Sequence, residues 1–341
     1  MSSGMSIVVT VLDDRLGLAE LLPALAAQHL PAQEIVIVDA GSTDGTAELI
    51  DYWRERGLPL RLMHVPGAGI SAGRNRGIVA AANDRIAVTD AGCRPVPGWL
   101  AALAHGLERC DFVAGTYTVD HATPFEHAVA VTLYPDVAEL SGRLSPATRA
   151  WLSLFGRRFR IDRATGRSMA FRRSCWEHAG GFPENVGWGE DVAFSAAVVY
   201  VDAYSTLAPD AIVAWRGRRT WRENAQMYWR YAAGEAMLGV QPRAVARGLA
   251  WAFAVVLGLC TGRRGRLTLC AGAATYASLP IVRAHRTGLA ARHWWRILAV
   301  VAMKDLAMLG GTVAGVRQRR RGAEPEPPPA VQPERRRPVA A

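Results

Sequence analysis

Lysine is almost absent from this sequence of 341 residues, because Lys304 is the one lysine among 40 basic side chains. The positive charge is therefore carried by arginine, whose planar guanidinium suits phosphate recognition better than an ammonium group does. Paired cysteines are absent as well, since the five cysteines form no C-x-x-C motif and are odd in number. This usage excludes a disulfide framework, argues against a zinc site and fits a reducing compartment.

The composition also differs from that of a disordered or collagenous chain, because 50% of the residues are apolar and 21% are charged. The chain is long enough for one large domain of catalytic size and a further region. A secretory leader is not expected, since the first apolar run, residues 7–12, is short and no basic segment precedes it. We therefore expect the N-terminal part to remain in the cytoplasm.

The net charge of +10 is concentrated in the C-terminal third. Residues 1–242 carry 23 basic and 26 acidic side chains, a net charge of −3, whereas residues 243–341 carry 17 and 4, a net charge of +13. Such an asymmetry is typical of a nucleic-acid-binding tail or of attachment to an anionic membrane. The same third holds three apolar segments, residues 248–261, 267–282 and 297–316. We therefore favour a membrane surface and expect no nucleic-acid partner.

The sequence predicts a domain over residues 1–242, an apolar basic helical region over 243–320 and a disordered tail over 321–341. The first apolar segment has 14 residues, about 21 Å as a helix, against a bilayer core of about 30 Å. Basic residues at both ends of the segments do not match the one-sided bias of a spanning helix. An interfacial helix could also point Lys304 and Asp305 to water. We expect helices lying on the cytoplasmic face of the cell membrane, with a spanning hairpin or a soluble helical subdomain as alternatives.

Short β-rich segments alternate with helical patterns through the first 118 residues. The expected strands are residues 7–12, 34–38, 60–65, 85–89 and 111–118, and the expected helices are 18–30, 46–56, 70–82 and 99–107. A further strand is expected at 168–172, a helix from Asp191 and another over 221–238. The alternation predicts an α/β fold, with a mostly parallel sheet, right-handed crossovers and helices on both faces.

Acidic residues follow two of the predicted strands. Asp39 comes directly after the second strand and Asp90 after the fourth, so both carboxylates should lie at the sheet edge where ligands of such folds bind. Each of them could instead be a turn or helix N-cap residue. In the segment that begins at Asp39, Ser42 and Asp44 can cap the next helix, while the Asp39 carboxylate can accept hydrogen bonds from a base or a ribose.

Two further motifs carry polar side chains. The first combines arginines with an amide, and the second consists of two adjacent acids. In residues 73–77, Gly-Arg-Asn-Arg-Gly, Arg74 and Asn75 offer donors for a phosphate or nucleotide, although a solvated helix face would look the same. Glu190 and Asp191 follow a glycine-rich loop at an expected helix start. Asp191 is therefore a candidate general base, and the alternative is a pair of acids that complements the helix dipole.

In order and spacing these motifs resemble those of the family 2 glycosyltransferases with the GT-A fold, over about residues 5–240. The resemblance implies that each motif has its place around a nucleotide-sugar donor and a sugar acceptor. The donor residues so implied are Asp39, Ser42, Asp44, Arg74, Asn75 and Asp90, the residues of the acceptor or phosphate side are Arg172, Trp188, Gln226 and Arg230, and the catalytic E-D motif is Glu190 and Asp191.

The sequence departs from the family pattern at three positions that bear on metal binding. Ala40 stands where many members have a second Asp, Gly92 replaces the second acid of D-x-D, and Trp215 stands where some relatives have a metal-ligating His. A divalent cation, Mg²⁺ or Mn²⁺, would then have Asp90 as its one evident protein ligand, with diphosphate and water supplying the rest.

The resemblance implies an inverting transfer of a sugar from a nucleotide-sugar donor to a hydroxyl of a cell-envelope lipid or polysaccharide. Asp191 would take the proton from that hydroxyl, and an Asp90-bound cation or arginines would stabilise the leaving diphosphate. The missing acid at Gly92 keeps open a catalytically impaired nucleotide-binding scaffold. The glycine-rich residues 67–73 also keep open, as a remote alternative, a dinucleotide-dependent oxidoreductase.

Overall fold

The computed structural model describes residues 4–141, 144–155, 158–185, 189–237 and 260–321, together with residues 253, 256 and 258. Three of the expectations from the sequence concern residues outside these ranges. They are Trp188, most of the apolar segment 248–261, and the tail from residue 322 onward.

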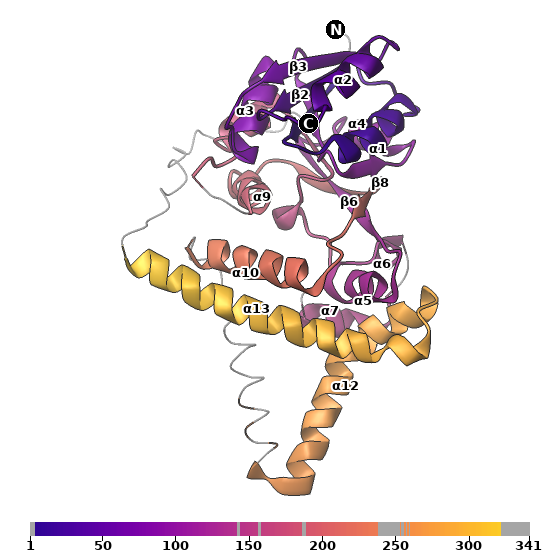
Figure 1. Ribbon diagram of the computed structural model, residues 1–341, viewed down its shortest axis with the longest axis vertical. Helices are drawn as coiled ribbons and strands as arrows, with labels where there is room; N and C mark the ends of the chain where they lie inside the picture. The colour runs from indigo at the N-terminus through magenta and orange to yellow at the C-terminus, as the bar shows by residue number, and fades with distance from the viewer. Residues whose placement is uncertain are drawn as a thin grey trace, which may run out of the picture.

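An eight-stranded sheet with the strand order β3-β2-β1-β4-β7-β6-β8-β5 forms the centre of the molecule (Figure 1). Its strands are β1 (Met5–Val11), β2 (Glu34–Asp39), β3 (Leu60–His64), β4 (Arg85–Val88), β5 (Cys93–Pro95), β6 (Phe112–Asp120), β7 (Met169–Arg172) and β8 (Ser205–Arg216). Strands β1 to β4 are parallel, whereas β7 runs antiparallel to both β4 and β6. The predicted α/β fold is thus confirmed, with an antiparallel strand inserted between the two parallel groups.

Helices cover the two faces of the sheet, and helices of the C-terminal part of the chain form a separate layer. They are α1 (Arg15–Ala26), α2 (Thr46–Arg54), α3 (Ile70–Ala80), α4 (Trp99–Gly106), α5 (Pro124–Leu133), α6 (Ala138–Ser141), α7 (Pro146–Phe155), α8 (Arg173–His178), α9 (Glu190–Tyr200), α10 (Trp221–Met237), α12 (Gly262–Arg286) and α13 (Trp295–Arg320), with 3₁₀ turns η1 (Ile161–Arg163) and η2 (Ala291–His293). Local chemistry sets several of the starts. Before α5, for example, Thr123 and Glu126 form a reciprocal capping box.

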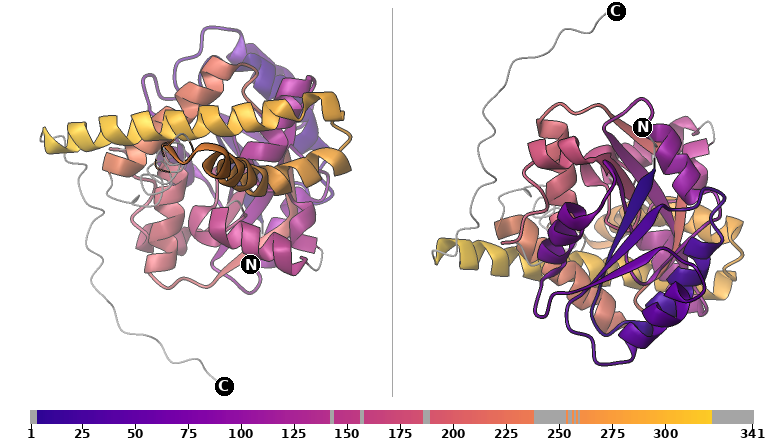
Figure 2. Two further views of the ribbon diagram at one scale, coloured as in Figure 1. Left: turned by 90° about the horizontal axis from the view of Figure 1, so that it is seen from below. Right: turned by 90° about the horizontal axis from the view of Figure 1, so that it is seen from above.

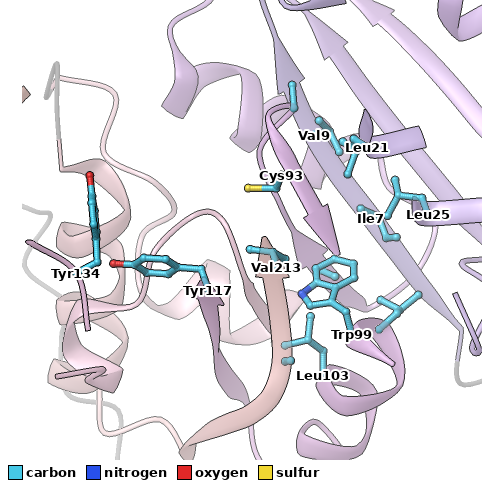
Figure 3. Close-up of a cluster of buried hydrophobic side chains, with 14 of the residues drawn as sticks. Ile7, Val9, Leu21, Leu25, Cys93, Trp99, Leu103, Tyr117, Tyr134 and Val213 are labelled. Atoms are coloured by element: carbon cyan, nitrogen blue, oxygen red, sulfur yellow. The ribbon is translucent and has the colours of Figure 1, made fainter. Parts of the chain in front are cut away.

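Apolar side chains pack against both faces of the sheet. On β1, Ile7 and Val9 point to the face covered by α1 and α4, whereas Val8 points to the face covered by α3 and α9. Figure 3 shows part of the first layer, in which Ile7 and Val9 lie near Leu21 of α1 and Trp99 of α4. This alternation along one strand is what a buried central strand requires, and it leaves the strand ends free to carry polar groups.

Helix α13 runs alongside α10 beneath the sheet domain, and α12 leads away from the body of the molecule (Figure 1 and Figure 2). Glycines allow the close approach of α10 and α13. A methyl group added at Gly311 would lie 2.1 Å from the carbonyl oxygen of Trp229, and one at Gly315 would lie 2.3 Å from that of Ala233. The two helices therefore touch along their backbones, as small residues spaced by four permit.

Two helices, Gly262–Arg286 and the segment Ala291–Arg320, are long and apolar enough to cross a membrane by length and composition. The expectation that Lys304 would point to water is wrong. Lys304 is 7% exposed and lies on the same face of α13 as Val300 and Met308, which packs on the rest of the protein. Its Nζ is 3.6 Å from Oδ1 of Asp305, so the charge is paired within the protein.

Candidate active site

A cavity of about 720 Å³ opens at the carboxyl ends of β1 and β4. Four parts of the chain that are distant in sequence meet there. Asp14 comes from the loop after β1, Asp90 follows β4, Glu190 and Asp191 begin α9, and Tyr231 lies on α10. The sheet edge expected from the sequence is therefore the edge at which the cavity lies, as is general for parallel sheets.

Arg74 of α3 joins the two acidic motifs. Its Nη1 donates to Oε1 of Glu190 and its Nη2 to Oδ1 of Asp90, each at 2.7 Å. The side chain is 1% exposed, and a methyl group added at Gly166 would lie 2.2 Å from Nη2. Burial acts to lower the pKa of Arg74, but Asp90, Glu190 and Asp191 outweigh it and raise that pKa. The guanidinium is therefore a permanent cation between the predicted donor and catalytic residues.

The two acids at the start of α9 have different surroundings. Glu190 is 7% exposed, and burial together with the neighbouring Asp191 raises its pKa in spite of Arg74. Asp191 accepts hydrogen bonds from the backbone N–H of Gly166 at 3.0 Å and of Val192 at 2.8 Å. These bonds fix the orientation of the Asp191 carboxylate at the cavity wall, which is what a general base needs.

The segment that begins at Asp39 forms a turn beside the cavity and does not contribute to the cavity wall. Asp39 is 2% exposed and accepts hydrogen bonds from the hydroxyl of Ser42 at 2.6 Å and from its N–H at 2.9 Å. Burial acts to raise the pKa of Asp39, but the bonds from Ser42 and Gly41 and the nearby His64 outweigh it and lower that pKa. Asp44 accepts from the Thr46 hydroxyl at 2.6 Å. A donor-binding role for Asp39, Ser42 and Asp44 stays a prediction.

Asn75 ties α3 to the glycine-rich loop before α9. Its Nδ2 donates to the Phe182 carbonyl at 2.8 Å and to Glu184 at 2.9 Å, and its Oδ1 accepts from the Phe182 N–H at 2.9 Å. Oδ1 also accepts from the indole N–H of Trp176 at 3.2 Å. The amide therefore positions the loop and is not placed at the cavity wall, in contrast to its expected role in lining the donor site.

Three residues expected on the acceptor side lie elsewhere. Arg172 of β7 is the register partner of Arg85 at the amino end of β4, opposite the cavity. Its Nη2 donates to the Leu107 carbonyl. Gln226 and Arg230 are exposed on α10, which lines the cavity through a different face. A helix turns 100° per residue, so that Glu223, Met227 and Tyr231 of α10 face the cavity instead. An acceptor-side role for Arg172, Gln226 and Arg230 stays a prediction.

Two cavity residues had not been singled out from the sequence. The Arg167 guanidinium lies 3.9 Å from the ring centroid of Trp215 and 5.1 Å from that of Tyr117. Asp14 caps α1 by accepting the Gly17 N–H at 3.0 Å. Arg167 is one of many arginines in its segment and Asp14 is a residue type common at helix N-caps, so neither has a distinctive sequence signal.

The residues around Asp90 fit a divalent cation in the chemistry of their donors. No cluster of three His, Cys, Asp or Glu side chains with metal-binding geometry occurs among the described residues. Carboxylate oxygens are nevertheless the ligands that Mg²⁺ and Mn²⁺ prefer, and a bound diphosphate would add more oxygens. Trp215 cannot act as a ligand, and it serves instead as the stacking surface for Arg167.

Comparisons with known proteins agree with this geometry. Residues 6–163 match the family model described as Glycosyl transferase family 2. The pre-mycofactocin glycosyltransferase of Mycobacterium tuberculosis is 23% identical over 369 residues, which cover 95% of this chain and 74% of the relative. Other curated relatives match over a quarter or less of their length. Among them the lipopolysaccharide core biosynthesis glycosyltransferase LpsC of Rhizobium meliloti is 56% identical over 36 residues, 11% of this chain and 13% of the relative.

The solved structure of the mannosyltransferase PcManGT from Pyrobaculum calidifontis, in complex with GDP-Man and Mn²⁺, has a TM-score of 0.53 to this chain. The sequences are 18% identical, and the match covers 94% of this chain and 88% of the other. At this identity the likeness shows a shared fold, the GT-A fold.

Proposed function

The chain is a glycosyltransferase with the GT-A fold and a family 2 domain over residues 6–163, and on this premise we propose that it transfers a sugar from a nucleotide-sugar donor to an acceptor hydroxyl with inversion at the anomeric carbon. The observation that carries the proposal is the Asp90–Arg74–Glu190 bridge, with Asp191 beside it at the cavity. This bridge supports the proposal because Asp90, expected at the donor, and Glu190, expected in the catalytic motif, bind the same guanidinium.

Asp191 is the general base of the proposed reaction. The acceptor oxygen would attack the anomeric carbon while its proton passes to the Asp191 carboxylate and the bond from that carbon to the diphosphate oxygen breaks. The carboxylate is oriented by the N–H groups of Gly166 and Val192. One displacement with no covalent sugar intermediate inverts the configuration.

The leaving diphosphate would meet positive charge already present in the cavity. Arg167 lines it together with Arg216, the last residue of β8, and with Arg218 and Arg219 of the segment that follows. A divalent cation held by Asp90 would, when bound, offset the same negative charge. Fixed cations of this kind stabilise charge that develops in the transition state at little reorganisation cost.

We further propose that the acceptor is a lipid or polysaccharide of the cell envelope, reached at the cytoplasmic face of the membrane. The support comes from the apolar side chains that α12 and α13 leave exposed, which are Leu267, Val282, Trp295, Leu298, Leu306, Val313 and Val316. Basic residues lie at the last turn of α13, as is typical of helices that rest on an anionic lipid surface. The name of LpsC supports an envelope acceptor as well.

The test is a donor panel followed by analysis of the product. Nucleotide-sugars that bind the native state should raise the melting temperature, and the best of them should then support transfer to lipid extracts of the cell envelope. NMR of the product should show an anomeric configuration opposite to that of the donor. Retention would overturn the inverting mechanism, and donor binding with neither transfer nor hydrolysis would favour a nucleotide-binding scaffold.

A further inference from the structure

We propose that Asp14 supplies the second carboxylate of the cation site, in place of the acid that is missing at Gly92. The inference rests on the proposed function, because the cation would serve the diphosphate of the donor. It assigns to a residue of the β1–α1 loop a task that the family's D-x-D motif assigns to the end of β4.

The two loops meet because their strands are neighbours. Strand β1 pairs in parallel with β4, so the loop that carries Asp14 leaves the sheet beside the loop that carries Asp90 and Gly92. All three residues line the cavity. A Cβ atom at Gly92 would lie 3.7 Å from Oδ2 of Asp14. The Asp14 carboxylate therefore occupies the space next to the one that an aspartate at position 92 would enter.

Each carboxylate has one oxygen that is hydrogen-bonded to the protein, which leaves the other as a candidate ligand of the cation. Oδ1 of Asp90 pairs with Arg74, and Oδ1 of Asp14 caps α1 through the Gly17 N–H. The second oxygens of the two side chains are hard donors of the type that Mg²⁺ and Mn²⁺ take. Two such ligands are too few to hold a cation tightly, so the diphosphate must complete its coordination. Cation binding should therefore depend on the nucleotide.

Conservative variants separate the two tasks of Asp14. In Asp14→Asn the amide oxygen can still cap α1, because Asn is as good an N-cap as Asp, but the negative charge is lost. Asp13→Asn is the matched control. Asp13 is the neighbour of Asp14 in the sequence, but it accepts a hydrogen bond from the Thr43 N–H and is not placed at the cavity wall. Asp14→Asn combined with Gly92→Asp returns a carboxylate to the site from the other loop, where only Oδ2 of Asp14 lies within 4 Å of the new Cβ.

The experiment is a titration with MnCl₂, followed by electron paramagnetic resonance, with and without UDP or GDP. The full chain should bind Mn²⁺ more tightly with a nucleoside diphosphate than without. Asp14→Asn should weaken that binding by at least about tenfold, since the loss of even an outer-shell partner of a metal costs about 10- to 100-fold. Asp13→Asn should bind as the wild type does, and the double variant should recover most of the affinity.

Equal Mn²⁺ affinity of the wild type and Asp14→Asn would overturn the proposal, as would a wild type that binds no Mn²⁺ with either nucleotide. A failure of Asp14 differs from a failure of the proposed function. In the first case the wild type still transfers sugar, but Asp14→Asn binds Mn²⁺ with the same affinity as the wild type. In the second case no donor supports transfer, whatever the titration shows.

Discussion

The guanidinium of Arg74 donates to Glu190 at 2.7 Å although the two residues are 116 positions apart in the sequence. Its other terminal nitrogen holds Asp90 at the same distance. One buried cation thereby fixes Asp90 at the end of β4 relative to Glu190 at the start of α9, the residues proposed for donor binding and catalysis. A change at Arg74 should consequently affect folding and catalysis together.

We expect Arg74→Gln to lower the free energy of unfolding by about 3–5 kcal/mol, because it leaves the buried Glu190 carboxylate without its cation. Arg76→Gln is the matched control, since Arg76 is exposed on the same helix, and its effect should stay within about 0.5 kcal/mol. Urea denaturation followed by circular dichroism measures both. Equal stability of the two variants would show that the bridge contributes nothing to the fold.

Asp191→Asn should reduce kcat by about 10²- to 10⁴-fold, the usual contribution of a general base, and leave the Kd of the nucleotide unchanged. The amide oxygen can still accept one of the two N–H bonds, from Gly166 or from Val192, so the fold should be retained. Asp210→Asn, at an exposed position of β8, serves as the control. Steady-state transfer assays and nucleotide calorimetry provide the two readouts, and turnover at the wild-type rate would remove Asp191 from the mechanism.

Gly166→Ala should impair catalysis through geometry alone. The new methyl group would lie 2.2 Å from Nη2 of Arg74, and the residue's N–H also holds Asp191. A displacement of about 1 Å at such a site can lower the rate by about a hundredfold. Gly98→Ala introduces the same methyl group into open space and should be silent. Single-turnover transfer rates of the two variants test this, and equal rates would contradict it.

His127 should make stability fall in acid. Burial and the ring of His121, stacked at 3.8 Å, lower its pKa to about 4 from the ordinary 6.5. Between these values the unfolded chain binds the proton and the folded chain does not, so stability rises with pH across this window and is lost as the pH falls through it. His127→Gln can keep a bond to Thr287 and should flatten the melting temperature between pH 4.5 and 6.5, a range given by roughly these pKa values.

The exposed His105 provides the comparison for that measurement. His105→Gln should leave the pH profile of the melting temperature as it is in the wild type. A His127→Gln profile identical to that of the wild type would show that His127 is not the titrating group.

Gly311→Ala should loosen α13 from α10, because the methyl group would lie 2.1 Å from the Trp229 carbonyl oxygen. Overpacking of this kind costs about 1–3 kcal/mol. Gly272→Ala in α12 meets no atom within 4 Å and should be neutral or stabilising, since Ala favours helix. Thermal unfolding in detergent compares the two, and an equal melting temperature would argue against a close seam between the helices.

Most of the sheet could be predicted from the sequence because strands β1 to β4 are short apolar runs between turns and helices, and such patterns are local. Strands β5 and β8 escaped prediction for physical reasons. Strand β5 has three residues and ends in Pro95, while β8 contains Pro209 and pairs with β6 through a register shift. Their partners in the sheet, rather than their own periodicity, make them strands.

The sequence by itself determined the order of the strands and helices from β1 to β4, the edge at which Asp90 would lie, and the glycosyltransferase motifs, all of which follow from local patterns and fixed spacings. The tertiary structure decided which side chains share the site. It placed Arg74 between two acids, turned Tyr231 rather than Arg230 toward the cavity, and set Asp14 beside Gly92. These relationships depend on how separate elements pack and turn against each other, and a linear pattern carries no information on that distance or direction.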